Sequence, residues 1–124
     1  MMRRFAIGLV IASFVSLAQA SDVSVAVNGK TVRLWGIDAP AAGETCTTTA
    51  GKVWPCGARV RDQLRAVFTD EKPLCEEKPE GFVLCRASGL DVGLLLVKEG
   101  LAKSTGPYAE IEARARSAKV GLWE

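Results

Sequence analysis

The chain has 124 residues, of which 48% are hydrophobic and 24% charged, and its formal net charge is +2. This length suits one ordinary domain, and the composition is that of a globular protein, which excludes the disordered, collagenous and solenoid classes. The sequence contains no histidine, which excludes Ser-His-Asp and Cys-His catalysis and every zinc site that includes a histidine.

The first twenty residues have the pattern of an export signal. Arg3 and Arg4 form a positively charged n-region, residues 5–17 are predominantly apolar, and Ala18-Gln19-Ala20 has the small-x-small form that signal peptidases cut. We therefore expect a cleaved signal peptide and a periplasmic or secreted protein without a membrane span. An uncleaved anchor is the alternative, although the apolar run is shorter than the roughly 20 residues that a membrane helix needs.

Cleavage after Ala20 would leave residues 21–124 as a single mature domain with no excess charge. Arg3 and Arg4 supply the formal excess, so the mature part has 14 basic and 14 acidic residues. Proteins that bind nucleic acid through its phosphates usually carry a basic surplus. Net charge therefore gives no support to nucleic-acid binding, and only a local basic groove would favour it.

All four cysteines, Cys46, Cys56, Cys75 and Cys85, lie in this mature part. An even number in an exported chain predicts disulfides. Of the three pairings we favour Cys46 with Cys56 and Cys75 with Cys85, because each closes a short loop between elements that should lie side by side. Each bridge would stabilise the protein by about 2.5 to 3 kcal/mol. A metal site of four thiolates is the alternative, but the spacing is not that of zinc knuckles.

The predicted elements begin with a β-hairpin. Residues 22–37 alternate between apolar and polar side chains, and Asn28-Gly29 is suited to the tight turn between two strands. Asp38-Ala39-Pro40 ends the second strand, and the small polar residues of 41–56 predict a loop. Residues 57–68 have apolar side chains at helical spacing, which predicts an amphipathic helix that covers a sheet.

The second half of the chain predicts another hairpin and two more helices. Residues 72–76 and 82–87 are short β-like runs separated by a turn at residues 78–81. Residues 91–99 predict a short apolar helix, and residues 107–119 a last helix with proline at its start. The fold class is therefore α+β, with three helices.

Four stretches of the sequence, taken in order, resemble one known family. They are residues 31–40 (TVRLWGIDAP), Cys46 with residues 52–57 (KVWPCG), residues 91–102 (DVGLLLVKEGLA), and scattered positions from Tyr108 to Trp123. Together they are similar to the exported staphylococcal-nuclease-like, or thermonuclease, domain. The resemblance implies an OB-like small β-barrel packed against three helices, and an enzyme that hydrolyses phosphodiester bonds of DNA and RNA with calcium.

The resemblance assigns retained residues to phosphate and calcium binding. Arg33 stands at the position of the family's first phosphate-binding arginine, and Asp38 at that of a calcium ligand. Asp22 could serve as a second calcium ligand only if the alignment shifts by one residue. The residues alone leave other roles open: Arg33 could be a solvated strand residue or a partner of Asp38, and Asp38 could end the strand through local hydrogen bonds.

Two catalytic positions of the family are changed in this chain. Ala41 stands where active members have the glutamate that handles the attacking water, and Phe82 where they have the second phosphate-binding arginine. Glu44 could act as a substitute base only if its loop refolds, and Arg86 need not point to the same place. Loss of a general base typically lowers the rate about 10²- to 10⁴-fold.

These substitutions lead to two functional hypotheses. We favour an exported, non-catalytic domain that binds a ligand or a protein partner, and a weak calcium-dependent nuclease is the alternative. The family's first strand would fall in the signal peptide, so we expect an open barrel edge that could pair with a partner strand. We expect Trp35, Trp54 and Trp123 to pack in the core or at its rim rather than to stack on bases.

Overall fold

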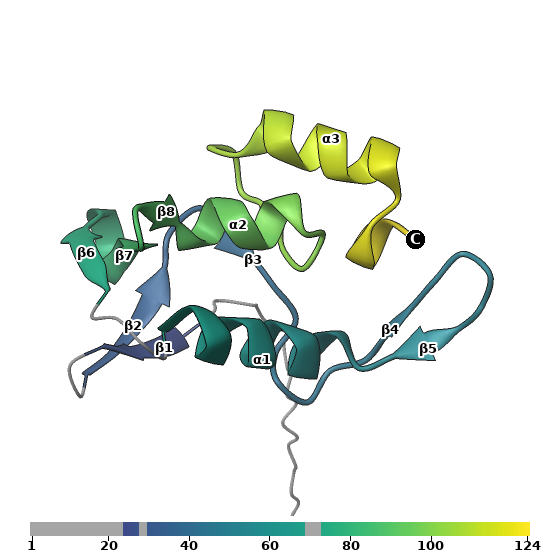
Figure 1. Ribbon diagram of the computed structural model, residues 1–124, viewed down its shortest axis with the longest axis horizontal. Helices are drawn as coiled ribbons and strands as arrows, with labels where there is room; N and C mark the ends of the chain where they lie inside the picture. Colours follow the sequence, from purple (N-terminus) through teal and green to yellow (C-terminus); the bar gives the residue numbers. More distant parts are fainter. Residues whose placement is uncertain (1–23, 28–29, 69–72) are drawn as a thin grey trace, which may run out of the picture.

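The computed structural model describes residues 24–27, 30–68 and 73–124, which form a mixed α+β fold with three α-helices and several strands in open sheets (Figure 1). The expected signal peptide, Asp22 and the turn at Asn28-Gly29 lie outside the described residues. Within the described part of the chain, no helix is long and apolar enough to cross a membrane.

The main sheet is built around its strand β7. The strands β1 (Ser24–Val27) and β2 (Lys30–Leu34) form the predicted antiparallel hairpin, and β2 pairs in parallel with β7 (Phe82–Ala87). On the other side of β7 lies β6 (Leu74–Glu77), and the short β8 (Leu90–Asp91) also pairs with β7. Among the described residues nothing pairs β1 with β6, so this sheet is open. The OB-like barrel stays a prediction.

Two short pairs of strands lie beside the main sheet. The strand β3 (Ile37–Asp38) pairs with β9 (Lys103–Ser104), and β4 (Cys46–Thr47) pairs with β5 (Val53–Trp54). The prediction of a plain loop over residues 41–56 is wrong where β4 and β5 form this hairpin. Two-residue strands are too short for alternation to indicate them.

Three helices occupy the places that the sequence predicts, within two residues at each end. The helix α1 (Cys56–Phe68) places its apolar stripe against the core, and α2 (Val92–Lys98) contacts both β7 and α3 (Ala109–Ala118) (Figure 1). Two short 3₁₀ helices, η1 (Pro79–Gly81) and η2 (Gly121–Trp123), complete the elements. The core includes the buried side chains of Leu34, Val60, Leu64, Val83, Val92, Leu96 and Val97.

Both predicted disulfides are present. Cys46–Cys56 joins β4 to the first residue of α1, and Cys75–Cys85 joins β6 to β7 at directly opposed positions. No free cysteine remains among the four, all of which lie in the described residues. The alternative of a metal site made of four thiolates is therefore wrong.

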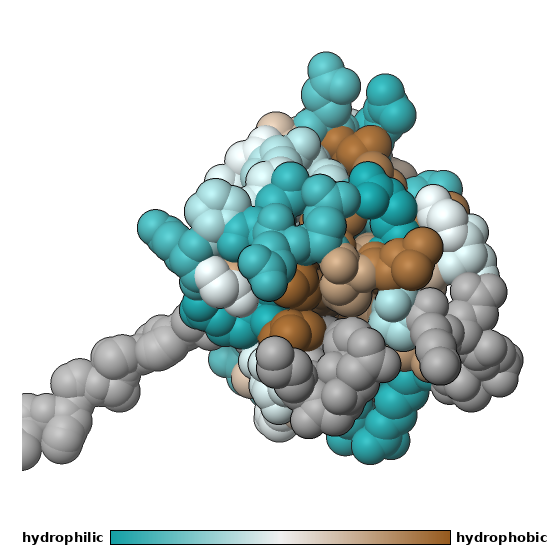
Figure 2. Space-filling model, turned by 90° about the vertical axis from the view of Figure 1, so that its left-hand side faces the viewer, coloured by the Kyte–Doolittle hydropathy of each residue, from teal (hydrophilic) through white to brown (hydrophobic). Residues whose placement is uncertain are grey.

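The end of the molecule that carries β6, β7 and β8 exposes hydrophobic side chains. Figure 2 views this end and shows hydrophobic residues lying among hydrophilic ones. Leu74 in β6 is 77% exposed and Leu90 in β8 is 56% exposed, although both belong to strands that pair with β7. Single exposed leucines of this kind are common on protein surfaces and need no partner to account for them.

Candidate ligand-binding site

A pocket of about 320 Å³ lies where the end of β2, the start of β7 and two turns meet. The turn that follows β2 contains Gly36, whose φ of 85° is strained for any other residue, and a Cβ there would lie 2.9 Å from the Tyr108 ring. The turn therefore packs closely on Tyr108. We call this the aromatic pocket; its lining residues are Trp35, Gly36, Ile37, Pro79, Glu80, Phe82 and Thr105.

Arg33 lies against two lining residues of the aromatic pocket. It is opposite Phe82 in the parallel register of β2 and β7, and its guanidinium carbon lies 4.1 Å from the centroid of the Phe82 ring. Its Nη2 donates a hydrogen bond of 2.6 Å to the backbone oxygen of Glu80. The guanidinium is thus oriented by a cation–π contact and a charge-assisted hydrogen bond.

Trp35 lines the aromatic pocket and directly follows β2, the strand that carries Arg33. Its ring packs partly against the core, with the Tyr108 ring edge-on at 6.1 Å between centroids. The Lys78 ammonium lies 4.5 Å from the centroid of Trp35 and 3.8 Å from a carboxylate oxygen of Glu76. Trp35 is therefore packed at the rim of the core, with a lysine on one face of its ring.

Tyr108 packs against both Trp35 and the turn at Gly36. It is buried, and its hydroxyl donates a hydrogen bond of 2.7 Å to the Asp91 carboxylate, which also accepts from the Leu94 backbone N–H at 3.2 Å and so caps α2. Burial raises the pKa of Tyr108, and the hydrogen bond to Asp91 and its negative charge raise it further. The phenol therefore stays a neutral donor at physiological pH.

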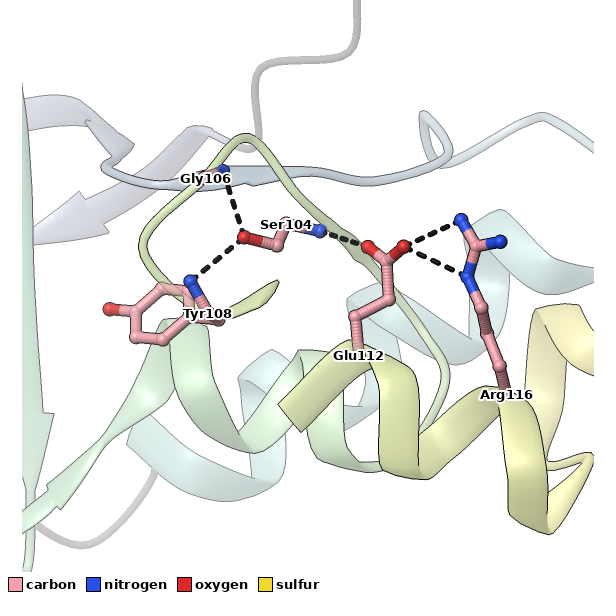
Figure 3. Close-up of polar contacts among 5 residues, drawn as sticks. All are labelled: Ser104, Gly106, Tyr108, Glu112 and Arg116. Atoms are coloured by element: carbon pink, nitrogen blue, oxygen red, sulfur yellow. Dashed lines mark hydrogen bonds and ion pairs between the residues drawn. The ribbon is translucent and has the colours of Figure 1, made fainter. Parts of the chain in front are cut away.

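The loop between β9 and α3 carries Thr105 to the pocket and is held by a polar network (Figure 3). The Ser104 hydroxyl oxygen accepts hydrogen bonds from the backbone N–H groups of Gly106 (2.9 Å) and Tyr108 (2.8 Å). The Ser104 N–H donates to Glu112 at 2.7 Å, and Arg116 donates twice to the other Glu112 oxygen.

Glu112 is therefore the charged centre of this loop. Burial acts to raise the pKa of Glu112, but the hydrogen bonds from Ser104 and Arg116 and the positive charges of Arg116 and Lys103 outweigh it and lower the pKa. A carboxylate that accepts several hydrogen bonds is fixed in place, and the backbone that carries Thr105 is fixed with it. The Thr105 N–H donates to the Gly36 oxygen at 2.9 Å, which joins the two turns.

The other residues that the sequence singled out lie outside the aromatic pocket. Asp38 is exposed on β3, where it is opposite Lys103 of β9. Glu44 closes its own loop, since its carboxylate accepts from the Ala41 N–H at 2.7 Å and its N–H donates to the Ala41 oxygen at 2.9 Å. The structure thus brings together Arg33 and Phe82 but does not place Asp38 or Glu44 on the pocket lining.

The carboxylates that the structure describes do not gather into a cluster of three or more that could hold a metal ion. Calcium takes six to eight oxygen ligands, usually from several carboxylates and carbonyls. Among residues 24–27, 30–68 and 73–124, no group of three or more histidines, cysteines, aspartates or glutamates could hold a metal ion. Asp38 therefore has no such group around it, and Asp22 lies outside these ranges.

Comparison with known proteins adds no assignment to this site. No protein-family model matches the chain, and no curated protein matches it.

Sequence reasoning missed most of the aromatic pocket. Pro79, Glu80 and Thr105 come from turns whose positions only the folded chain defines. Trp35 and Phe82 had a usable signal, because both are large aromatic residues beside the alternating positions of predicted strands. The contact of Arg33 with Phe82 depends on the parallel pairing of β2 with β7, which no local sequence pattern indicates.

Proposed function

We propose that the mature chain is an exported, non-catalytic binding module of the staphylococcal-nuclease-like type, and that the aromatic pocket holds its ligand. The contact of Arg33 with Phe82 and Glu80 carries this proposal. In the family that the sequence resembles, an arginine at this position stabilises charge on a phosphate. Here an aromatic ring and a carbonyl oxygen orient the same guanidinium, and the lining offers ring surfaces.

The side chains at the family's base position and in the loop that follows it support the non-catalytic part of the proposal. Ala41 has no proton-accepting side chain, and the carboxylate of Glu44 is used by the Ala41 N–H of the same loop. A general base must reach the proton that it removes within about one hydrogen bond. One oxygen of the Glu44 carboxylate is held by this loop contact, and Glu44 does not line the aromatic pocket.

The lining of the aromatic pocket supports a ligand with a flat or apolar group. Trp35, Pro79 and Phe82 provide apolar surface, while Arg33 and Lys78 place positive charge beside the rings of Phe82 and Trp35. Pockets of this size and character bind small molecules, or one side group of a larger molecule.

Two further observations support the architecture and the location in the proposal. The order β1-β2-β7-β6, with the core on one face of the sheet, agrees with an OB-like barrel that a further strand would complete. The two disulfides agree with export to an oxidising compartment.

Digestion of single-stranded DNA and RNA by the purified protein tests the proposal. The assay compares calcium with chelator and includes Asp38→Ala as the matched variant. We expect no cutting by folded protein under either condition. Calcium-dependent cutting that disappears in Asp38→Ala would overturn the non-catalytic proposal and establish the nuclease alternative.

A further inference from the structure

A second pocket, also of about 320 Å³, is lined by residues of the β4–β5 hairpin, of α1 and of the segment that follows α3. It shares no lining residue with the aromatic pocket. The Thr49 N–H donates to the backbone oxygen of Glu124 at 3.1 Å, and the Leu122 N–H donates to the Gly100 oxygen at 2.8 Å. These hydrogen bonds join the β4–β5 turn to the C-terminal segment, and that segment to the turn after α2.

Three cationic side chains from separate elements line this pocket. Lys52 comes from the turn between β4 and β5, Arg59 from α1, and Lys119 from the end of α3. None of these three forms an ion pair with any residue in the described ranges. Other surface cations do pair with carboxylates, namely Arg61, Lys78, Arg86 and Arg116.

Two carboxylate side chains, Glu99 and Glu124, line the same pocket as the three cationic ones. The five charged side chains therefore sum to one positive charge. Burial raises the pKa of Glu99, while the positive charges of Lys98 and Arg59 act to lower it.

Trp54 gives the pocket an apolar surface. The guanidinium carbon of Arg59 lies 5.6 Å from the centroid of the Trp54 ring, and the ring is partly packed against the core. This contact keeps Arg59 beside the pocket without neutralising its charge. We call the pocket formed by Lys52, Trp54, Arg59, Glu99, Lys119 and Glu124 the basic pocket.

We propose that the basic pocket binds a small polyanion, a compound with two or more phosphate or carboxylate groups. A single ion of one charge could contact only part of this arrangement, whereas a polyanion can approach cations from three elements at once. The contacts are partly exposed, so each cation adds a modest amount to affinity and screening by salt weakens all of them. This site is independent of the ligand proposed for the aromatic pocket.

Nuclear magnetic resonance titration of the disulfide-bonded protein tests the proposal, with inorganic pyrophosphate and citrate as the probes. We expect saturable shifts of the backbone amides around Lys52, Arg59 and Lys119 and of the Trp54 indole. Pyrophosphate alone would assign phosphate chemistry, citrate alone would assign carboxylate chemistry, and both would support a general polyanion site.

Matched variants separate this site from general ionic attraction. Lys52→Ala and Lys119→Ala should each weaken binding about two- to fivefold. Arg114→Ala removes an exposed cation of α3 that does not line the pocket and should leave the affinity unchanged. Glu99→Gln should tighten binding about twofold, because it removes a negative charge from the lining; a purely structural role would not produce this opposite sign.

The proposal is overturned if neither probe shifts these resonances. It is also overturned if the shifts fail to saturate, or if Arg114→Ala weakens binding as much as Lys52→Ala does. Thermal unfolding of each variant confirms that it is folded before titration, and Glu99→Gln supplies the test by itself if a lysine variant does not fold.

Discussion

The aromatic pocket and the basic pocket are equal in volume but differ in what their charged groups already contact. Beside the aromatic pocket, Arg33 donates a hydrogen bond to the Glu80 backbone oxygen and lies over the Phe82 ring, and Lys78 forms an ion pair with Glu76. In the basic pocket, Lys52 and Lys119 have no such partners among the described residues. A cation that already contacts a ring or a carboxylate has less positive charge to offer a ligand. Cations without such partners can attract an anion.

The largest expected effect comes from removing the disulfide beside the basic pocket. Cys46→Ser together with Cys56→Ser should lower the free energy of unfolding by about 3 kcal/mol, because the unfolded chain loses a loop constraint. The same change frees the β4–β5 hairpin from α1, so amide resonances around the basic pocket should shift while those around the aromatic pocket stay in place. Urea unfolding and amide spectra measure the two effects.

The second disulfide is the control for this comparison. Cys75–Cys85 closes a loop with the same separation of ten residues. Its removal should cost about the same free energy of unfolding, but should shift resonances of β6 and β7 and leave the basic pocket unchanged. If both double variants shift the same amide resonances, the two disulfides do not stabilise separate pockets.

A smaller effect is expected from a substitution confined to the aromatic pocket. Gly36→Ala should lower the free energy of unfolding by about 1 to 3 kcal/mol, because φ is positive there and the new Cβ would press on Tyr108. Gly43→Ala is the matched control, since nothing lies within 4 Å of its added Cβ. Equal thermal stability of the two variants would contradict the close packing of this turn, and polyanion binding at the basic pocket should survive both.

The pH dependence of stability should depend on Glu112, which holds the Thr105 loop of the aromatic pocket. Its pKa is lowered in the folded protein, so the unfolded chain binds more protons and stability rises with pH. The contribution is present above the ordinary value of 4.5 and is lost as the pH falls through the lower folded value.

Glu112→Gln tests this contribution. The variant should lower the free energy of unfolding by about 1 to 2 kcal/mol at neutral pH, since the hydrogen bonds from Ser104 and Arg116 weaken. The difference from the parent protein should shrink in acid, as urea unfolding at several pH values will show. Glu110→Gln on the exposed side of α3 is the control. A constant difference across pH would contradict the role of the Glu112 charge.

The smallest effect is expected at the exposed end of the sheet, which belongs to neither pocket. Leu74→Ser should change the free energy of unfolding by less than about 0.5 kcal/mol, because the side chain is 77% exposed. Both pockets should keep their spectra. A loss of several times this amount in thermal unfolding would mean that Leu74 packs against something that the described residues do not include.

Sequence reasoning predicted the elements better than the sites because the signals of the elements are local. The stripe of Val60 and Leu64 indicated α1, and the short loops that local pairing of the cysteines closes indicated the disulfides that are present. The β4–β5 hairpin was missed because its strands have two residues each. The roles proposed for Arg33, Asp38 and Glu44 came from a resemblance, and they stay predictions.

The sequence by itself determined the α+β class, the three helices and the pairing of the cysteines, because helical periodicity, turn residues and short loop closure act between neighbours along the chain. Only the tertiary structure decided which groups meet in space. The parallel pairing of β2 with β7 put Arg33 on Phe82, 49 positions away in the sequence. Folding also brought Lys52 and Lys119 to one pocket, because distant segments come together through the packing of the core, which no local pattern records.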